Sequence, residues 1–301
     1  MLASLGKHPT TNNERRTFNG LAMRNPLEVE RSKLDVRCSQ ILGVKFDCVT
    51  FEETLSCIEG MIASRQPHYV VTANVDFLVR ARRDAELRRI LNEAHLTLCD
   101  GTPLVWASRL LGNPLPARVA GSDLAPQLIR VAAKKRWRLF FLGATPEANA
   151  QAVANARAPF PNLEIAHFSP PFQPLDKMDH DAIRAKILAA RPDILLVAFG
   201  CPKAEKWMAM NYRALGVPVM IGVGGTIDFL AGKLKRAPLW MQRAGLEWTF
   251  RLWQEPRRLF GRYITDLWHF GWAMAAELWR ARCRARRKTS EGIPHIVQGT
   301  P

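Results

Sequence analysis

Residues 194–225 read ILLVAFGCPKAEKWMAMNYRALGVPVMIGVGG, which is a strand, a helix and a second strand in succession. The apolar runs at 194–200 and 219–223 are short, continuous and closed by glycine, whereas the segment 205–215 has the length and composition of a helix. Strands that are apolar throughout and separated by helices are typical of a parallel sheet with helices on both faces. This stretch therefore predicts a Rossmann-like α/β fold.

The same alternation continues on the N-terminal side of this unit. The glycines that close the strands are expected to mark the ligand-binding edge, because ligands of parallel sheets gather beyond the carboxyl ends of the strands. These glycines are Gly143, Gly200, Gly224 and Gly225. Further strands are predicted at residues 41–46, 68–72, 97–99, 137–143 and 163–168, and further helices at 50–62, 146–156 and 181–190 and in a segment that ends at Leu91.

The composition is that of a globular protein with a strongly basic charge. The chain has 301 residues and a net charge of +16. Its six cysteines form no C-x-x-C pair and have no histidines at metal-ligand spacing, so we expect reduced thiols and a cytoplasmic protein. Residues 1–36 are predicted to be a disordered tail without a signal peptide, and no window approaches the ~20 apolar residues of a membrane-spanning helix.

Basic residues and tryptophans gather near the C-terminus. Residues 251–288 contain ten Lys and Arg against three acids, and six of the nine tryptophans lie within 240–279. This composition predicts that residues 246–288 form a helical appendage, broken near Pro256, which binds an anionic membrane surface peripherally. The alternative is a solvated basic helix that packs its tryptophans on its own domain. Residues 289–301 are predicted to be a tail.

An ordered set of short motifs runs along the chain. They are T-x-N-x-D from Thr72, D-G at Asp100, R-V-A-G-S-D-L from Arg118, F-L-G from Phe141, G-x-P-K-x-E from Gly200, G-x-G-G-x-x-D-F-x-x-G-x-x-x-R-A-P from Gly222 and G-L-E-W from Gly245. In this order, over about residues 40–263, they resemble the WecG/TagA/CpsF family of glycosyltransferases. The chain departs from the family at Ala204, where a glutamine is usual, and so lacks one hydrogen-bond donor and one acceptor.

The resemblance implies an activity and its partners. An α/β domain over residues 37–245 is expected to transfer a hexose-type sugar, such as N-acetylmannosamine, from a UDP-sugar donor to a polyprenyl-diphosphate-linked acceptor, with inversion. The implied setting is cell-surface polysaccharide or exopolysaccharide assembly at the inner face of the cell membrane. No cofactor, metal or nucleic acid is expected to take part, and a homo-oligomer is left open.

Asp100 is the expected catalytic base, a role carried over from the family. A carboxylate at the end of a strand can take a proton from the acceptor hydroxyl, and the adjoining Gly101 lets substrate approach the backbone. Without the resemblance, Asp-Gly is more commonly a turn. Thr72 and Asn74 end the preceding strand, where family members line the active-site pocket, or else they cap the helix that follows.

Groups that hold the donor diphosphate are expected around the glycine turns. Guanidinium groups and N–H donors can stabilise the charge that develops on the departing nucleotide. The candidates are Arg118, Gly121, Lys203 and Arg236, joined by Glu205 and Asp228 from the same motifs and by Arg251 and Arg258 of the appendage, which are expected to face the active site.

Two sequence patterns and two other functions compete with this interpretation. Asp179 and Asp181 form a D-x-D pattern that binds metal in another glycosyltransferase architecture, but acids in a first helical turn also interact favourably with the helix dipole. Residues 222–227 begin like a G-x-G-x-x-G dinucleotide motif, except that Ile227 replaces the third glycine. The alternatives to an enzyme are a basic nucleic-acid-binding protein and a membrane-recruited homologue without catalysis.

Overall fold

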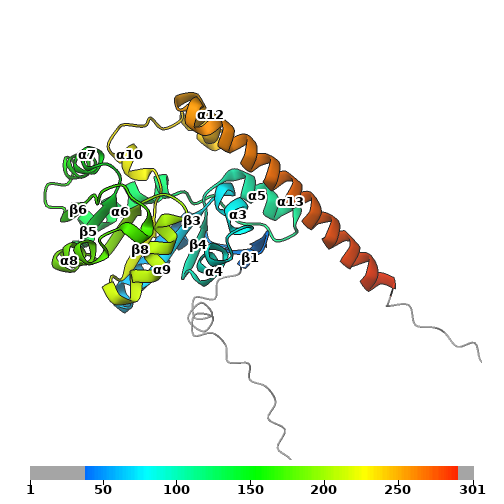
Figure 1. Cartoon of the computed structure of the whole chain (residues 1–301), viewed down its shortest axis with the longest axis horizontal. Helices are drawn as coiled ribbons and strands as arrows, with labels where there is room; N and C mark the ends of the chain where they lie inside the picture. Colours follow the sequence, from blue (N-terminus) through cyan, green and yellow to red (C-terminus); the bar gives the residue numbers. More distant parts are fainter. Residues whose placement is uncertain (1–37, 291–301) are drawn as a thin grey trace, which may run out of the picture.

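The computed structural model describes residues 38–290, and its centre is a six-stranded parallel sheet (Figure 1). The strands lie in the order β4-β3-β8-β7-β5-β6. The predicted α/β class is confirmed, whereas the tail predicted at 1–36 lies outside the described residues. The strand bounds are β3 His68–Ala73, β4 Leu96–Cys99, β5 Leu139–Gly143, β6 Ile165–Phe168, β7 Ile194–Ala198 and β8 Val219–Gly222.

Helices cover both faces of the sheet because each central strand is apolar on both sides. Val70 and Val71 of β3 follow one another and therefore enter different cores. The core on the Val71 side is completed by α4 (Ala85–Glu93), α8 (His180–Ala190) and α9 (Lys203–Leu215). The core on the Val70 side is completed by α2 (Phe51–Ser64), α6 (Gly121–Lys135) and α7 (Pro146–Arg157).

The single strand predicted at 41–46 is wrong. The chain forms two short strands there, β1 (Cys38–Ile41) and β2 (Val44–Asp47), which pair antiparallel outside the main sheet. The two residues between them, Leu42 and Gly43, have positive φ values of 49° and 81°. A two-residue turn of this kind reverses the chain. The sequence does not indicate the turn, because Leu42 is apolar like the strand residues around it.

The single helix predicted to end at Leu91 is also wrong, because local capping divides it. α3 (Val75–Ala81) is followed by Asp84, whose side chain accepts from the Leu87 N–H at 2.9 Å and starts α4. The predicted capping box of α2 is confirmed, with reciprocal hydrogen bonds between Thr50 and Glu53. The remaining short helices before the appendage are α5 (Thr102–Leu110), η1 (Leu175–Lys177), α10 (Thr226–Leu230) and α11 (Leu239–Arg243).

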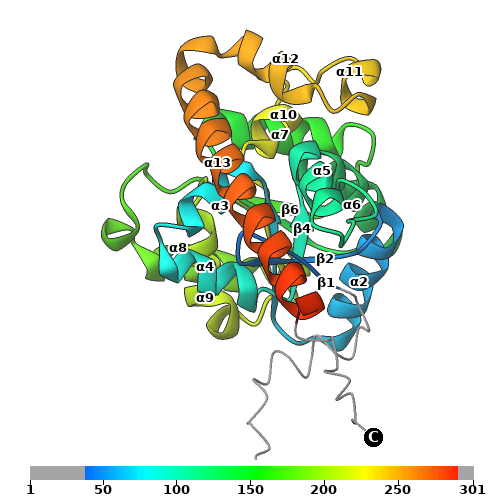
Figure 2. The same cartoon turned by 90° about the vertical axis from the view of Figure 1, so that its right-hand side faces the viewer.

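The C-terminal appendage consists of α12 (Glu247–Gln254) and α13 (Pro256–Ser290), and the predicted break at Pro256 is confirmed. α13 has 35 residues and runs across the outside of α3 (Figures 1 and 2). At 1.5 Å per residue its length is about 50 Å. One face of α13 is buried on the domain through residues such as Leu259 and Phe270.

The far half of α13 is tied to the β1–β2 hairpin. The Glu277 carboxylate accepts a hydrogen bond from the Leu42 N–H at 3.0 Å. In the part of the chain that the structure describes, no helix combines the length and the apolarity needed to cross a membrane. The tail predicted at 289–301 begins with two residues that extend α13, and the rest of it lies outside the described residues.

The contact between β5 and β7 gives a test of the fold. Gly143 has a φ of +99°, and a Cβ added there would lie 2.8 Å from the Ala198 carbonyl oxygen. We expect Gly143→Ala to lower the free energy of unfolding by about 1–3 kcal/mol, measured by urea denaturation. The control is Gly60→Ala in α2, where an added Cβ has no neighbour within 4 Å and is expected to stabilise the helix by about 0.5–1 kcal/mol. Equal effects of the two substitutions would contradict the packing described.

Candidate active site

Asp100 lies at the carboxyl edge of the sheet, immediately after β4. Its N–H donates to the Ala73 carbonyl at the end of β3 (2.9 Å), which continues the parallel pairing by one residue. Its carboxylate accepts a hydrogen bond from the Gly121 N–H, and 28% of the side-chain surface is exposed. The carboxylate is therefore held in place and still open to a substrate hydroxyl.

The surroundings of Asp100 make it a better base than an ordinary aspartate. Burial raises the pKa of Asp100 to about 6, although Arg118 and Arg251 both favour its ionised form. A carboxylate with such a pKa is mostly ionised at pH 7 and accepts a proton more readily than one with the usual pKa near 4.

Two arginines and two carboxylates form an ion-pair cluster beside Asp100. The Arg118 guanidinium lies 3.9 Å from the Asp100 carboxylate, 2.6 Å from that of Asp123 and 3.3 Å from that of Glu247. Arg236 binds the carboxylates of Asp123 and Glu247, each at 2.7 Å. Because Arg118 and Asp123 flank the start of α6 whereas Arg236 and Glu247 come from the C-terminal segment, this cluster holds the two segments together.

Gly121 allows three elements to meet at this edge. A Cβ at Gly121 would lie 3.4 Å from the hydroxyl oxygens of Thr72 and Thr226. Thr72 is buried and donates to the Gly222 carbonyl at 2.8 Å. The structure thus places Thr72 as a link between β3 and β8 directly under the start of α6.

Asn74 caps α3 and also adjoins the Asp100 loop. Its side-chain oxygen accepts from the Asp76 N–H at 3.1 Å, which is the capping alternative considered from the sequence. Its Cβ lies 3.9 Å from the position that a Cβ on Gly101 would take. The amide nitrogen of Asn74 has no hydrogen-bond partner among residues 38–290, so a bound sugar hydroxyl could accept from it.

Arg251 of α12 reaches over the glycine turn that follows β8. Its guanidinium lies 3.5 Å from the position of a Cβ on Gly225 and 5.1 Å from the ring centre of Phe229. Its Nε is buried without a hydrogen-bond partner in the described part of the chain. Gly224, which precedes Gly225 in this turn, has a φ of +54°, and a Cβ added to it would have no neighbour within 4 Å. An unpaired buried donor above a glycine turn suits an anionic ligand.

A second group of predicted residues lies farther along the edge, after β7. Lys203 donates to the Gln173 carbonyl at 2.9 Å and lies 4.9 Å from the ring of Phe172, which is 97% exposed. Glu205 is buried, and burial raises its pKa to about 7. A Cβ on Gly222 would lie 3.0 Å from the Glu205 carboxylate, so Glu205 supports the end of β8 from below.

Other predicted residues are not gathered around Asp100. Gly143 and Gly200 lie at the ends of β5 and β7, beyond β8 in the sheet order. Arg258 at the start of α13 is exposed and pairs with Glu255 at 2.7 Å. Asp228 is half-buried in α10, one residue before Phe229, which Arg251 contacts.

The D-x-D pattern has a structural role. Asp179 is the N-cap of α8 and accepts from the Ala182 N–H at 2.9 Å, and Asp181 in the first turn is exposed and pairs with Arg184. Within the described residues, no group of three or more His, Cys, Asp or Glu side chains could hold a metal ion. All six cysteines are present as thiols and not as disulfides.

The sequence did not reveal the part played by two acids and one alanine. Asp123 stood out only as part of the R-V-A-G-S-D-L motif, and Glu247 only as part of the G-L-E-W motif, yet both bind the paired arginines. The available signal was that both acids lie in or next to motifs that carry those arginines. Ala204 is fully buried in α9, so the position at which the chain departs from the family faces the core.

Comparison with known proteins identifies this architecture. The model of the glycosyl transferase WecG/TagA/CpsF family matches residues 39–284, which include the whole sheet, Asp100, the ion-pair cluster and most of α13. The chain belongs to the WecG/TagA/CpsF family. It is therefore a glycosyltransferase, and the resemblance inferred from the motifs is confirmed.

Similar members of the family carry one enzyme name, N-acetylglucosaminyldiphosphoundecaprenol N-acetyl-beta-D-mannosaminyltransferase. The protein of that name from Bacillus subtilis (strain 168) is 36% identical over 190 residues, which are 63% of this chain and 72% of the relative. The one from Staphylococcus aureus (strain MW2) is 30% identical over 221 residues, which are 73% of this chain and 85% of the relative. These relatives transfer an amino sugar to a lipid-linked acceptor, as their name states.

The charge beside Asp100 gives a test of the site's electrostatics. Because Arg118 favours the ionised carboxylate, we expect Arg118→Gln to raise the pKa of Asp100 above about 6. The acidic limb of the pH–rate profile should therefore move to higher pH in this variant. Lys135→Gln is the control, because it removes one positive charge from a surface pair with Glu59. If the acidic limb of the pH–rate profile stays in place in Arg118→Gln, or moves equally in both variants, it does not report Asp100 beside Arg118.

Proposed function

We propose that this glycosyltransferase moves N-acetylmannosamine or a related hexose from a UDP-sugar to a polyprenyl-diphosphate-linked sugar, with inversion and without a metal. The observation that carries the proposal is the Asp100 carboxylate, with its raised pKa, next to a glycine turn that lies under the unpaired Arg251. A base after β4 and an anion-binding group over the turn after β8, with only β3 between these two strands, supply what direct displacement at a nucleotide sugar requires.

In the proposed reaction the acceptor oxygen attacks the anomeric carbon from the side of Asp100. Asp100 takes the hydroxyl proton as the new carbon–oxygen bond forms. The bond between the anomeric carbon and the diphosphate oxygen breaks on the opposite face, and UDP leaves with its electron pair. A single displacement of this kind inverts the configuration at the anomeric carbon.

The leaving diphosphate needs positive charge, and we assign this task to Arg251 together with the backbone of the glycine turn. The Arg251 Nε is an available donor, and Gly224 and Gly225 leave the backbone open to an approaching phosphate. Arg118 and Arg236 are already paired with Asp123 and Glu247, so their proposed role is to fix the geometry and the field around Asp100. Asn74 and Gly101 are proposed to contact the sugars.

The decisive substitution for catalysis is Asp100→Asn, since an amide keeps the shape but cannot accept the proton. We expect UDP release in the presence of a polyprenyl-diphosphate-sugar acceptor and EDTA to fall by about 10²–10⁴. Binding of UDP, measured by calorimetry, is expected to change less than about threefold, because the diphosphate lies with Arg251 in the proposed complex.

Asp123→Asn is the matched control for Asp100→Asn, since it neutralises a neighbouring acid of the ion-pair cluster without touching the proposed base. Its effect on turnover is expected to be smaller by at least about tenfold. Retention of more than half of the wild-type rate in Asp100→Asn would rule out Asp100 as the base.

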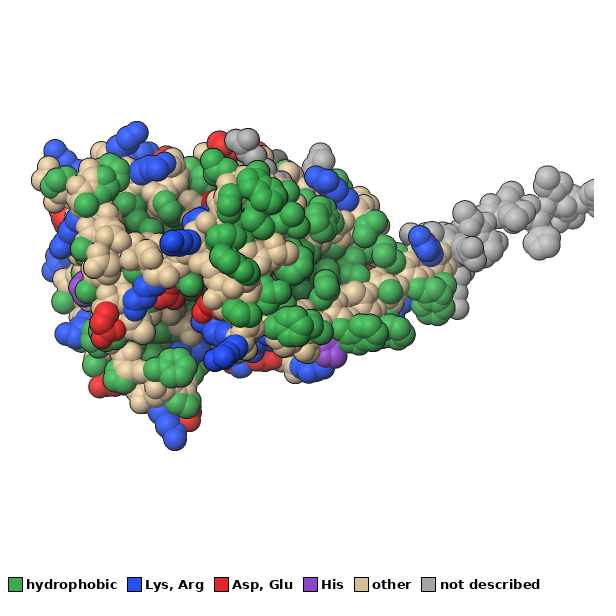
Figure 3. Space-filling model, turned by 90° about the horizontal axis from the view of Figure 1, so that it is seen from above, with side chains coloured by type: hydrophobic (Ala, Val, Ile, Leu, Met, Phe, Trp, Pro, Cys, Tyr) green, Lys and Arg blue, Asp and Glu red, His purple; other side chains and the backbone are tan. Residues whose placement is uncertain are grey.

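We further propose that α13 lies on the inner surface of the cell membrane. Its outward face carries exposed apolar side chains that recur mainly at four-residue spacing, and Figure 3 shows them as a continuous row. Tryptophan prefers the headgroup region of a bilayer, and the basic residues of the appendage are attracted to anionic lipid. We call this row the apolar stripe; it consists of Phe260, Ile264, Leu267, Trp268, Trp272 and Trp279.

The apolar stripe predicts how membrane binding is lost. We expect the double substitution Trp268→Ser and Trp272→Ser to reduce partitioning onto phosphatidylglycerol-containing vesicles by at least about tenfold, because each ring loses its apolar burial. The measurement is co-sedimentation with vesicles. Leu188→Ser on α8, an exposed apolar residue on another element, should bind like the wild type. If the double variant also binds like the wild type, the stripe does not face lipid.

A further inference from the structure

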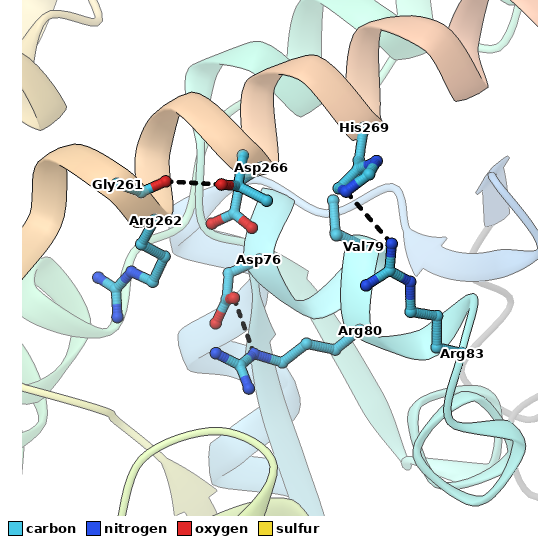
Figure 4. A pocket seen from close by; sticks show the side chains of 9 residues that line it. Asp76, Val79, Arg80, Arg83, Gly261, Arg262, Asp266 and His269 are labelled. Carbon is cyan, nitrogen blue, oxygen red and sulfur yellow. Dashed lines mark hydrogen bonds and ion pairs between the residues drawn. The ribbon is translucent and has the colours of Figure 1, made fainter.

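A pocket lined by charged side chains lies between α3 and α13. Its volume is about 330 Å³, and side chains from both helices point into it (Figure 4). The lining is unusually rich in charge, with three arginines, one histidine and two aspartates: Arg80, Arg83, Arg262, His269, Asp76 and Asp266. The proposed transfer reaction makes no use of this pocket.

The cations of the pocket have unused hydrogen-bonding capacity. Arg80 uses its Nε for Asp76 at 2.7 Å, which leaves the two terminal nitrogens of the guanidinium. Arg83 contacts the Nε2 of His269 at 3.2 Å through one terminal nitrogen. Arg262 makes no hydrogen bond or ion pair with any residue that the structure describes, and it lies 5.6 Å from the ring centre of Tyr263. Several donors are thus free to bind an added acceptor.

The two carboxylates do not cancel this positive charge. Asp76 is neutralised by its ion pair with Arg80. Asp266 is buried, and burial raises its pKa above the usual range, so its negative charge is less stable there than it would be in water. Three guanidinium groups against two carboxylates leave the pocket with an excess of one positive charge at neutral pH, before any protonation of Asp266.

The position of the pocket around α13 points to the origin of its ligand. At about 100° per residue, Arg262 and Thr265 lie between the face that is packed on the domain and the apolar stripe. Figure 3 shows basic and histidine side chains along one edge of the hydrophobic row. With the stripe in the headgroup region, this edge faces the level at which lipid phosphates lie.

We propose that the pocket between α3 and α13 is a binding site for the phosphate group of a lipid. Arg83 and Arg262 donate to the phosphate oxygens, Arg80 adds its free terminal nitrogens, and the lipid tail leaves along the apolar stripe. The phosphate belongs either to a membrane phospholipid or to the diphosphate of a polyprenyl-linked sugar. The placement of the tail uses the membrane contact proposed above, but phosphate binding itself depends neither on that contact nor on sugar transfer.

The first experiment measures binding of a soluble lipid phosphate to the full chain. Calorimetry with dihexanoylphosphatidic acid, below its micelle concentration, should show saturable binding, and dihexanoylglycerol, which lacks the phosphate, should not bind. Arg262→Gln and Arg83→Gln should each weaken the binding by about tenfold, because each removes a charged hydrogen bond. Asp266→Asn should strengthen it by about twofold to fivefold by removing a like charge.

Arg280→Gln is the matched control for Arg262→Gln. Arg280 follows Arg262 by 18 residues, which is about five full turns, so it has the same direction on the same helix but lies outside the pocket. We expect the affinity of the Arg280→Gln variant for dihexanoylphosphatidic acid to equal that of the wild type. Equal affinities in the wild type, Arg262→Gln and Arg83→Gln would overturn the proposal, and so would an equal loss in Arg280→Gln. A higher affinity of Asp266→Asn for dihexanoylphosphatidic acid cannot come from partial unfolding. This variant therefore separates an effect on binding from an effect on stability.

A second experiment distinguishes the two sources of phosphate. Steady-state transfer in nonionic detergent, without phospholipid, gives the KM for the polyprenyl-diphosphate-sugar acceptor. If the pocket holds the acceptor, Arg262→Gln raises this KM about tenfold and leaves the KM of the UDP-sugar unchanged. If it holds a membrane phospholipid, both KM values stay unchanged and binding to phosphatidylglycerol vesicles falls. Calorimetry requires no turnover, so the two proposals can fail separately. Phosphate binding in the pocket can be refuted while the proposed sugar transfer stands, and the proposed sugar transfer can be refuted while phosphate binding stands.

Discussion

The ion-pair cluster of Arg118, Asp123, Arg236 and Glu247 is the interaction on which the site depends. Each carboxylate lies between two guanidinium groups, so removal of any one member leaves this partly buried cluster with one uncompensated charge, which is a costly state. The cluster joins the start of α6 to the C-terminal segment. It thereby fixes Arg118 beside Asp100 and brings the appendage that carries Arg251 over the glycine turn.

The same arrangement explains why Asp100 can be a base at neutral pH. Burial alone would favour the protonated carboxyl, whereas the neighbouring guanidinium groups favour the carboxylate, and the balance raises the pKa only to about 6. An arginine that was not held by Asp123 and Glu247 could move onto Asp100 and form a close pair, which would lower its basicity. The distance of 3.9 Å from Arg118 is consistent with this restraint.

The sheet could be predicted from the sequence because continuous apolar strands between helices leave few other architectures. Asp100, Thr72, Asn74 and Gly121 were proposed from their places in the family motifs, and they lie together because the ends of parallel strands converge at one edge of the sheet. The hairpin turn at Leu42 could not be predicted, since its positive φ is imposed by the surrounding structure. Glu247 was missed for a similar reason, because its partners lie far away in sequence and meet it only after the appendage folds back. The pocket between α3 and α13 likewise exists only in the folded chain.

The central claim is that the appendage supplies part of the active site, and the most direct measurement compares two arginines of that segment. The turnover number for sugar transfer is determined in nonionic detergent, where no bilayer is needed, for Arg251→Gln and for Arg257→Gln, which is exposed at the start of α13. The account predicts a loss of about 10²–10³ for Arg251→Gln, as for removal of one preorganised donor to a developing anion, and a change within about twofold for Arg257→Gln. Equal turnover in both variants and the wild type would contradict it.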